Sequence, residues 1–388
     1  MKDEAEYEGD REAVGLGARR CRDAEGVSDV AKIVADVRDR GDAALRAWAE
    51  RLSDGPPERV SPGGELDAET MRAVRSLVAA VEAVHAAQRP SDTTVRPIAG
   101  IEVVRRWLPV ESVGIYVPAG LPSSLVMTAV PARLAGVPRI AVATPRPSNA
   151  MLATACELGI DELYTMGGAQ AIAALAYGTE TIPPVAKIVG PGNRWVTEAK
   201  LLVSSRVAVD LPAGPSEVLV IADESVDAEA CAADLLAQAE HGPDGESVLL
   251  TPSTELAAAV VARVGDRARV ELVGSLEEAV ARANEIAPEH LELLVDDPDA
   301  LVADVRNAGA VFLGTTAVVG DYAAGSNHVL PTGGLARGVG GLGLEAFLKP
   351  VQFVKATAEG LASVRETVAV LAELEGLPEH ARALAVRA

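Results

Sequence analysis

The sequence predicts an α/β protein, and two observations carry this prediction. Short apolar segments of strand length alternate with segments of helical period over residues 113–203, and the same alternation returns over residues 217–313. Glycine and proline turns separate the segments, which is typical of parallel strands with helices on both faces. The two runs predict two similar Rossmann-like lobes with incomplete, parallel-rich sheets. A ligand is expected between them.

Composition narrows the class of protein further. The 388 residues suffice for two or more domains, and 49% hydrophobic residues predict a folded chain. The net charge of −21 argues against nucleic acid or an anionic membrane as a partner. The acidic start lacks a signal-peptide core, and no apolar run is long enough to span a bilayer. The three cysteines have no CxxC spacing, so we expect a reduced, cytoplasmic protein.

A helical segment is expected before the first lobe. Apolar residues at three-four spacing predict helices over 27–52 and 67–88, with a Pro- and Gly-rich break at 53–64. His85, beside Val81 and Val84, is interpreted as a packing residue rather than a ligand. We expect residues 1–100 to form a helical N-terminal segment that packs on the second lobe.

The first lobe is expected to span residues 101–222. Its expected strands are 113–118, 139–145, 162–166 and 217–222, and its expected helices are 123–136, 149–159, a helix opening at 167–171, and 196–202. Glycine turns open two of these helices, at 167–168 and 190–192. Such turns let backbone amides approach a phosphate, although a tight turn alone also requires glycine.

The second lobe, residues 223–335, repeats this order and is followed by a tail. Its expected helices are 228–240, 255–264 and 276–285, and its expected strands are 247–250, 270–273, 291–295 and 310–313. Residues 320–332 have no apolar period and many polar side chains, as functional loops often do. Residues 336–388 are expected to form a helical tail, with helices at 344–359 and 361–374, that crosses a dimer interface.

Histidines near the ends of elements suggest the chemistry. Gln238 and His241 stand three apart on one expected helix, and both side chains can bind zinc, although a polar helix end is the more common explanation of such a pair taken alone. His290, His328 and His380 also fall in loops or at element ends, with acidic residues nearby. Clusters of this kind suit zinc binding or acid–base catalysis, so the residues predict a metalloenzyme.

Five motifs, in order along the chain, resemble those of the histidinol dehydrogenase family. They cover residues 189–193, 210–218, 238–244, 287–291 and 320–332, and the resemblance extends from about residue 27 to the C-terminus. It implies one zinc ion per subunit, with the ligands Gln238, His241, Asp321 and His380. It implies an acid–base pair, Glu289 and His290. The implied substrate contacts are Ser216, Gln238, His241, His290, Asp321, His328, Glu375 and His380, and the implied NAD contacts are Tyr116, Gln170 and Asn193.

The resemblance also implies a reaction and an assembly. The reaction is oxidation of L-histidinol to L-histidine through L-histidinal with two NAD, the last step of histidine biosynthesis. The assembly is a homodimer with shared active sites, in which His380 completes the site of the other subunit. One alternative is a member of the family that oxidises another small alcohol, such as a sulfonated diol, with NAD. Another is a zinc hydrolase that uses Glu289 as a base and no NAD.

Overall fold

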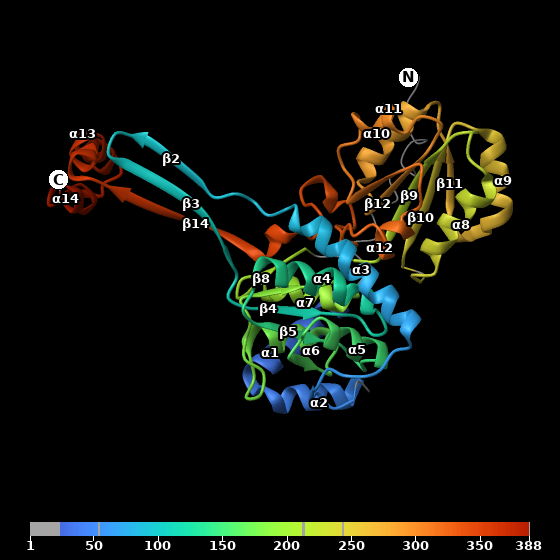
Figure 1. Cartoon of the computed structure of the whole chain (residues 1–388), viewed down its shortest axis with the longest axis horizontal. Helices are drawn as coiled ribbons and strands as arrows, with labels where there is room; N and C mark the ends of the chain where they lie inside the picture. Colours follow the sequence, from blue (N-terminus) through green and yellow to red (C-terminus); the bar gives the residue numbers. More distant parts are fainter. Residues whose placement is uncertain (1–23, 53–54, 212–213, 243, 388) are drawn as a thin grey trace, which may run out of the picture.

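Three sheets organise the chain into two lobes and a projecting arm (Figure 1). The computed structural model describes residues 24–52, 55–211, 214–242 and 244–387. The predicted two-lobed α/β architecture with parallel-rich sheets is confirmed. None of the described helices combines the length and the apolar character that a membrane span requires.

The first lobe contains a six-stranded sheet in the order β1-β6-β5-β4-β7-β8. All its neighbouring strands run parallel except β1, which pairs antiparallel with β6. Its elements are β1 (Arg59–Val60), β4 (Val113–Tyr116), α4 (Pro122–Ala135), β5 (Ile140–Ala143), α5 (Asn149–Glu157), β6 (Glu162–Tyr164), α6 (Gly168–Tyr177), β7 (Lys187–Val189), α7 (Arg194–Val203) and β8 (Ala208–Val209). The central strands are buried on both faces, which explains their continuous apolar sequences.

The second lobe contains a fully parallel five-stranded sheet in the order β11-β10-β9-β12-β13. Its elements are β9 (Glu217–Ala222), α8 (Ala228–Ala239), β10 (Glu246–Thr251), α9 (Thr254–Val264), η2 (Gly265–Arg267), β11 (Arg269–Leu272), α10 (Leu276–Ile286), β12 (His290–Leu294), α11 (Asp299–Val302), β13 (Ala310–Leu313) and α12 (Val318–Tyr322). Residues 217–222, predicted to lie in the first lobe, form the central strand of this second sheet, so that boundary was wrong.

The N-terminal helices pack on the first lobe. These helices are α1 (Ala24–Arg40), α2 (Asp42–Leu52) and α3 (Ala68–Ala86). Val30 and Val37 of α1 are buried in one cluster with Ile172 of α6, whereas Leu77 and Val81 of α3 are buried with Val126 and Val130 of α4. The prediction that this segment packs on the second lobe was therefore wrong. An apolar stripe shows that a helix is covered, but not by which surface.

The arm combines the end of the N-terminal segment with the C-terminal tail. Strands β2 (Thr93–Ile98), β3 (Ile101–Pro109) and β14 (Leu348–Ala356) form an antiparallel sheet, in the order β14-β3-β2, that carries α13 (Ala358–Leu374) and α14 (Pro378–Ala385) away from both lobes (Figure 1). Two short 3₁₀ helices, η3 (Leu335–Arg337) and η4 (Leu344–Phe347), precede β14. The helix predicted over 344–359 was wrong: Pro350 disfavours a helix interior, and Val351, Phe353 and Val354 favour a strand.

Candidate active site

The candidate residues gather at the amino-terminal edge of the second sheet. Ser216 directly precedes β9, Glu289 directly precedes β12, and His290 is the first residue of β12. Because β9 and β12 are neighbouring parallel strands, with His290 aligned to Val218, these side chains lie next to one another. The sequence places a carboxylate and an imidazole at the start of a buried strand, and the parallel pairing supplies the serine.

Glu289 is buried and holds two hydrogen bonds through one carboxylate oxygen. Its Oε2 atom accepts from the Ser216 hydroxyl at 2.7 Å and from the Glu217 amide at 2.8 Å. The side chain is 6% exposed, and burial raises the pKa of Glu289 to about 8, although both hydrogen bonds oppose this shift. The carboxyl group can therefore exchange a proton near neutral pH.

His290 has a defined tautomer. Its Nδ1 atom lies 3.0 Å from the carbonyl oxygen of Glu217. Since a carbonyl oxygen only accepts, Nδ1 carries the proton and Nε2 carries the lone pair. Nε2 lies 3.9 Å from Oδ1 of Asp321, and the ring packs against Phe312 with centroids 5.9 Å apart. Burial lowers the pKa of His290 to about 4, so the free ring is a neutral proton acceptor.

Asp321 lies between histidine rings. It belongs to α12, and its Oδ1 atom is 3.9 Å from His290 Nε2 and 3.8 Å from His328 Nδ1. Burial raises the pKa of Asp321 to about 6, and the nearby charge of His241 opposes the shift. Burial lowers the pKa of His328 to about 4, and its Nε2 atom lies 3.1 Å from the hydroxyl of Ser124. The polar loop 320–332 therefore delivers two of its residues to the cluster.

Gln238 and His241 approach this cluster from the end of α8. Gln238 is 6% exposed, and its Oε1 atom accepts from Ser216 at 3.3 Å, whereas its buried Nε2 atom has no hydrogen-bond partner among the described residues. If the carboxamide is turned over, nitrogen faces Ser216 and oxygen becomes the free acceptor. Such an oxygen is a suitable ligand for a cation. His241 is exposed, and its Nδ1 atom lies 3.2 Å from the Gln238 carbonyl oxygen, leaving Nε2 as the free donor atom.

The described residues of one chain do not assemble a complete metal shell. Within the described ranges, no three His, Cys, Asp or Glu side chains are arranged to hold a metal ion. Gln238, His241 and Asp321 lie in the second lobe, while Glu375 caps the end of α13 and His380 lies in α14 (Figure 1). Both of these residues are exposed at the end of the arm, away from the other candidates. The donor set of amide and carboxylate oxygens with imidazole nitrogens suits zinc if a fourth ligand comes from outside this chain.

The candidate cofactor residues lie in the first lobe, at the carboxyl ends of the parallel strands of its sheet. Tyr116 ends β4, and its hydroxyl accepts a hydrogen bond from the Gly168 amide at 3.3 Å. Gln170 is buried in the first turn of α6. Asn193 caps α7 and accepts from the amides of Trp195 and Val196. Two helix N-termini therefore meet one sheet edge, an arrangement that favours anionic groups.

Residues that the sequence interpretation missed complete the site. Ser124, which is 3% exposed at the start of α4, links the first lobe to His328. Glu217 supplies both a carbonyl group to His290 and an amide to Glu289. Phe312 of β13 packs on the His290 ring. No sequence signal points to Ser124 or Phe312, because only the packing of distant elements brings them here.

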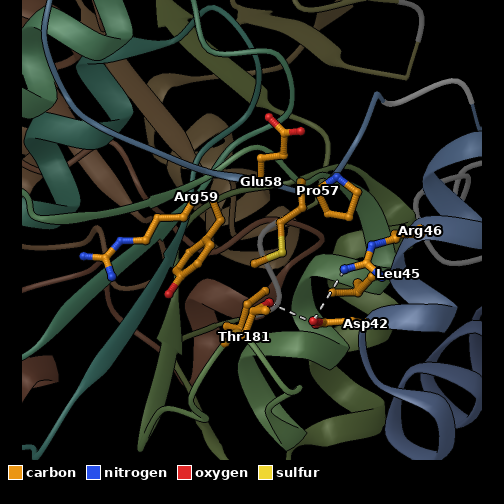
Figure 2. Close-up of a pocket in the computed structure, with 10 residues that line it drawn as sticks. Asp42, Leu45, Arg46, Pro57, Glu58, Arg59 and Thr181 are labelled. Carbon is orange, nitrogen blue, oxygen red and sulfur yellow. Dashed lines mark hydrogen bonds and ion pairs between the residues drawn. The ribbon is translucent and has the colours of Figure 1, made fainter.

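His85 behaves as predicted for a packing residue. It is fully buried, with Nδ1 2.9 Å from the Val81 carbonyl oxygen and Nε2 3.2 Å from the Asn327 amide nitrogen. A separate hollow of about 350 Å³ lies beside α2 and the end of β6 (Figure 2). There the Thr181 hydroxyl donates a hydrogen bond to the Asp42 carboxylate, which also forms an ion pair with Arg46. None of the candidate site residues lines it.

The same fold occurs in solved structures. A histidinol dehydrogenase from Elizabethkingia anophelis superposes with a TM-score of 0.86 at 35% identity, covering 93% of this chain and 91% of that one. An oxidoreductase from Marinobacter aquaeolei, at a TM-score of 0.51 and 15% identity over 85% of this chain and 86% of that one, shares the fold alone. The two parallel-rich sheets, with a buried Glu–His pair at the edge of one, and the likeness to a solved histidinol dehydrogenase at 35% identity place the chain in the class of α/β oxidoreductases.

Sequence comparison gives the family within that class. The family model described as histidinol dehydrogenase matches residues 18–388. A histidinol dehydrogenase from Agrobacterium fabrum is 45% identical, covering 92% of this chain and 91% of that protein, and one from Halobacterium salinarum is 44% identical, covering 93% and 92%. The chain belongs to the histidinol dehydrogenase family.

Proposed function

We propose that this protein oxidises L-histidinol to L-histidine through L-histidinal, as the last step of histidine biosynthesis. Each turnover consumes one water molecule and two NAD, and each oxidation step transfers a hydride to one NAD. Family membership supports the substrate and the cofactor. The observation that carries the proposal is the buried Glu289–His290 pair, whose two side chains are held by the backbone of Glu217 at the edge of the second sheet.

His290 is the proposed base for the alcohol. Its Nδ1–H group is held by the Glu217 carbonyl, so Nε2 can take the hydroxyl proton while the hydride leaves the carbon. Asp321, 3.9 Å from Nε2, stabilises the imidazolium that results. As water adds to the aldehyde, the imidazolium returns this proton to the aldehyde oxygen. His290 is then neutral and takes the proton of the hydrated aldehyde in the second oxidation by the same route.

Glu289 is the proposed base for the water molecule. With a pKa near 8, Glu289 becomes ionised at mildly alkaline pH, and the ionised carboxylate can accept a proton from water as the oxygen adds to the aldehyde carbon and then release it to solvent. Ser216 and the Glu217 amide hold one carboxylate oxygen in place, so the second oxygen is available for the water. Ser216 and His328 are also proposed substrate contacts.

A zinc ion is proposed as the cofactor that holds the substrate. Zinc has no redox chemistry, and when bound it would supply Lewis acidity that holds the amino alcohol. Gln238, His241 and Asp321 are its proposed ligands in one subunit, and His380 of a second copy is the proposed fourth ligand. The buried Nε2 atom of Gln238 has no partner among the described residues, and turning the carboxamide over places its oxygen there as a ligand, which supports this assignment. His241 and Asp321 would then coordinate the same ion.

A homodimer with shared active sites is proposed because the arm of a single chain exposes a large apolar surface to solvent. Its sheet and helices expose large apolar side chains: Val95, Ile98, Phe353, Val354, Val370, Leu371, Leu374, Leu377 and Val386 are between 41% and 80% exposed. Covering such a surface favours association. In the proposed dimer, each arm brings His380 and Glu375 to the site of the other subunit, where Glu375 contacts the substrate.

NAD is proposed to bind at the edge of the first sheet, against Tyr116, Gln170 and Asn193. The two helix N-termini there suit its phosphates. We propose a cytoplasmic location for the enzyme, with neither nucleic acid nor a membrane as its partner, in accord with its acidic net charge.

The test is a steady-state comparison of substrates with NADH absorbance as the readout. L-Histidinol is expected to give the higher kcat/KM, because the carboxylate of Glu375 suits an amino alcohol. If a sulfonated diol gave the higher kcat/KM, the protein would instead be a member of the family that oxidises another small alcohol with NAD. Turnover of an amide or ester without NADH would favour a zinc hydrolase.

A further inference from the structure

A lysine is buried beneath the turn that leads to the candidate cofactor residue Asn193. Lys200 of α7 is 2% exposed. Its Nζ atom donates to the carbonyl oxygens of Gly190 and Leu211, each at 3.0 Å, and forms an ion pair with Asp210. Two backbone carbonyl groups and one carboxylate therefore surround the ammonium group.

Asp210 holds the same turn from the other side. Its carboxylate is 1% exposed, and its Oδ2 atom accepts from the Gly190 amide at 2.7 Å. Both backbone polar atoms of Gly190 are therefore bound by the ion pair. Gly190 has a φ of +114°, and an added Cβ would overlap the carbonyl oxygen of Tyr116. The turn passes closely over the end of β4 and has little freedom to move.

The pair also joins two segments with different proposed roles. Gly190 opens the turn that ends at Asn193, the cap of α7. Leu211, whose carbonyl group binds Lys200, begins the segment that ends at Ser216, which binds Glu289. One buried ammonium group thus connects the proposed NAD turn to the segment that reaches the proposed acid–base pair.

Stability alone does not account for a pair of this kind. Burying two charges costs about as much as their attraction returns, and apolar side chains of similar volume are often equally stabilising. The charges fix the geometry, because an ammonium group bound to the carbonyl oxygens of Gly190 and Leu211 and paired with Asp210 holds two backbone segments together. A geometric role is the reason to retain it.

We propose that Lys200 and Asp210 are positioning residues that hold the turn over residues 190–193 in the geometry that binds the nicotinamide dinucleotide. This inference rests on the proposed function, since it takes Asn193 as a cofactor contact. Neither residue touches the cofactor. Both act through the backbone of Gly190, so their loss should weaken NAD binding more than substrate binding.

The test compares two double variants, each of which removes both charges of an ion pair and so leaves no uncompensated charge. Lys200→Met with Asp210→Asn removes the positioning pair. Arg139→Met with Glu162→Gln removes a matched ion pair at the opposite, amino-terminal edge of the same sheet, where Arg139 also donates to two backbone carbonyl groups. We expect the KM for NAD to rise about tenfold in the first variant only, with the KM for L-histidinol changed less than about twofold in both.

Two further checks keep the outcomes distinct. Thermal unfolding checks that both variants are folded at the assay temperature. Equal changes in the KM for NAD in the two variants, or parallel changes in both Michaelis constants, would overturn the positioning role. If the first variant does not fold, Lys200→Arg replaces it, because it keeps the charge but changes the donor geometry. An unchanged KM for NAD in that variant would overturn the proposal, and an increase would support it.

Asn193→Ala separates this inference from the proposed function. Wild-type protein that reduces no NAD would contradict the function itself. An Asn193→Ala variant with an unchanged KM for NAD would overturn the cofactor assignment and the positioning role together. A raised KM in Asn193→Ala with none in the Lys200 and Asp210 variant would overturn only the positioning role.

Discussion

The Nδ1 atom of His290 lies 3.0 Å from the carbonyl oxygen of Glu217, and this contact sets the proton on the far side of the ring from Asp321. The partner is a backbone atom, so no substitution at Glu217 removes it directly. It follows from the pairing of β9 with β12, which aligns His290 with Val218. The second sheet therefore orients the proposed base.

Replacing His290 with alanine should lower kcat for L-histidinol oxidation by about 10²- to 10⁴-fold, the usual contribution of a general base. Zinc content should remain near that of the wild type, because His290 is not a proposed ligand. Phe312→Leu is the matched control, since it removes the ring contact but keeps the base. Its kcat should fall less than about tenfold. Loss of zinc together with activity in His290→Ala would make His290 a ligand instead.

Glu289→Gln should change how stability depends on pH in metal-free protein. The pKa of Glu289 is raised from 4.5 to about 8, so the folded state holds this proton more tightly than the unfolded chain does. The resulting stabilisation is complete below pH 4.5 and is lost as the pH rises through about 8. Glutamine imitates the protonated form at every pH.

The free energy of unfolding of the wild type should therefore fall below that of Glu289→Gln as the pH rises across this interval. Urea unfolding midpoints at several pH values measure the difference. Curves that stay parallel from pH 5 to 8 would show that Glu289 does not titrate as its burial indicates.

Mixed subunits test whether the sites are shared. His380→Ala and His290→Ala homodimers should each be nearly inactive. In the heterodimer, the His290→Ala subunit donates an intact His380 to a site with an intact His290, so one of two sites is complete. After random reassociation at equal amounts, activity should recover to about a quarter of the wild type. Mixing without subunit exchange is the control, and no recovery after proven exchange would contradict the arm's proposed role.

Gly190→Ala should destabilise the first lobe more than Gly136→Ala. Both glycines have positive φ, at +114° and +85°, so alanine is strained at either position. Only at Gly190 does the added Cβ overlap a neighbouring backbone oxygen, whereas at Gly136 nothing lies within 4 Å of it. We expect Gly136→Ala to cost about 1 kcal/mol and Gly190→Ala at least about 2 kcal/mol more, measured by denaturant unfolding. Equal losses would show that the turn relaxes around the methyl group.

The strands and helices of the two lobes could be predicted because buried parallel strands have continuous apolar sequences between clear turns. The arm could not. Strand β14 is mostly exposed, so its sequence lacks a buried apolar face that would distinguish it from a helix. The covering partner of α1 was also unpredictable, because an apolar stripe such as Val30 and Val37 carries no information about its target.

The site divides in a similar way. Ser216, Glu289, His290, Asp321 and His328 are brought together by the pairing of β9 and β12 and by the loop after β13. Ser124 could not be predicted as a site residue, because it contacts His328 from the other lobe. Glu375 and His380 lie on the arm, and their proposed roles depend on a second subunit that no pattern within one chain describes.

Zinc content measured alongside NADH yield is the most direct test of the proposed chemistry. Purified protein should hold about one zinc ion per subunit and form two NADH for each L-histidinol consumed, and His241→Ala should lose both metal and activity. Chelation should abolish NADH formation, and added zinc should restore it. Full NADH formation by metal-free protein, or consumption of L-histidinol without NADH, would contradict the proposal.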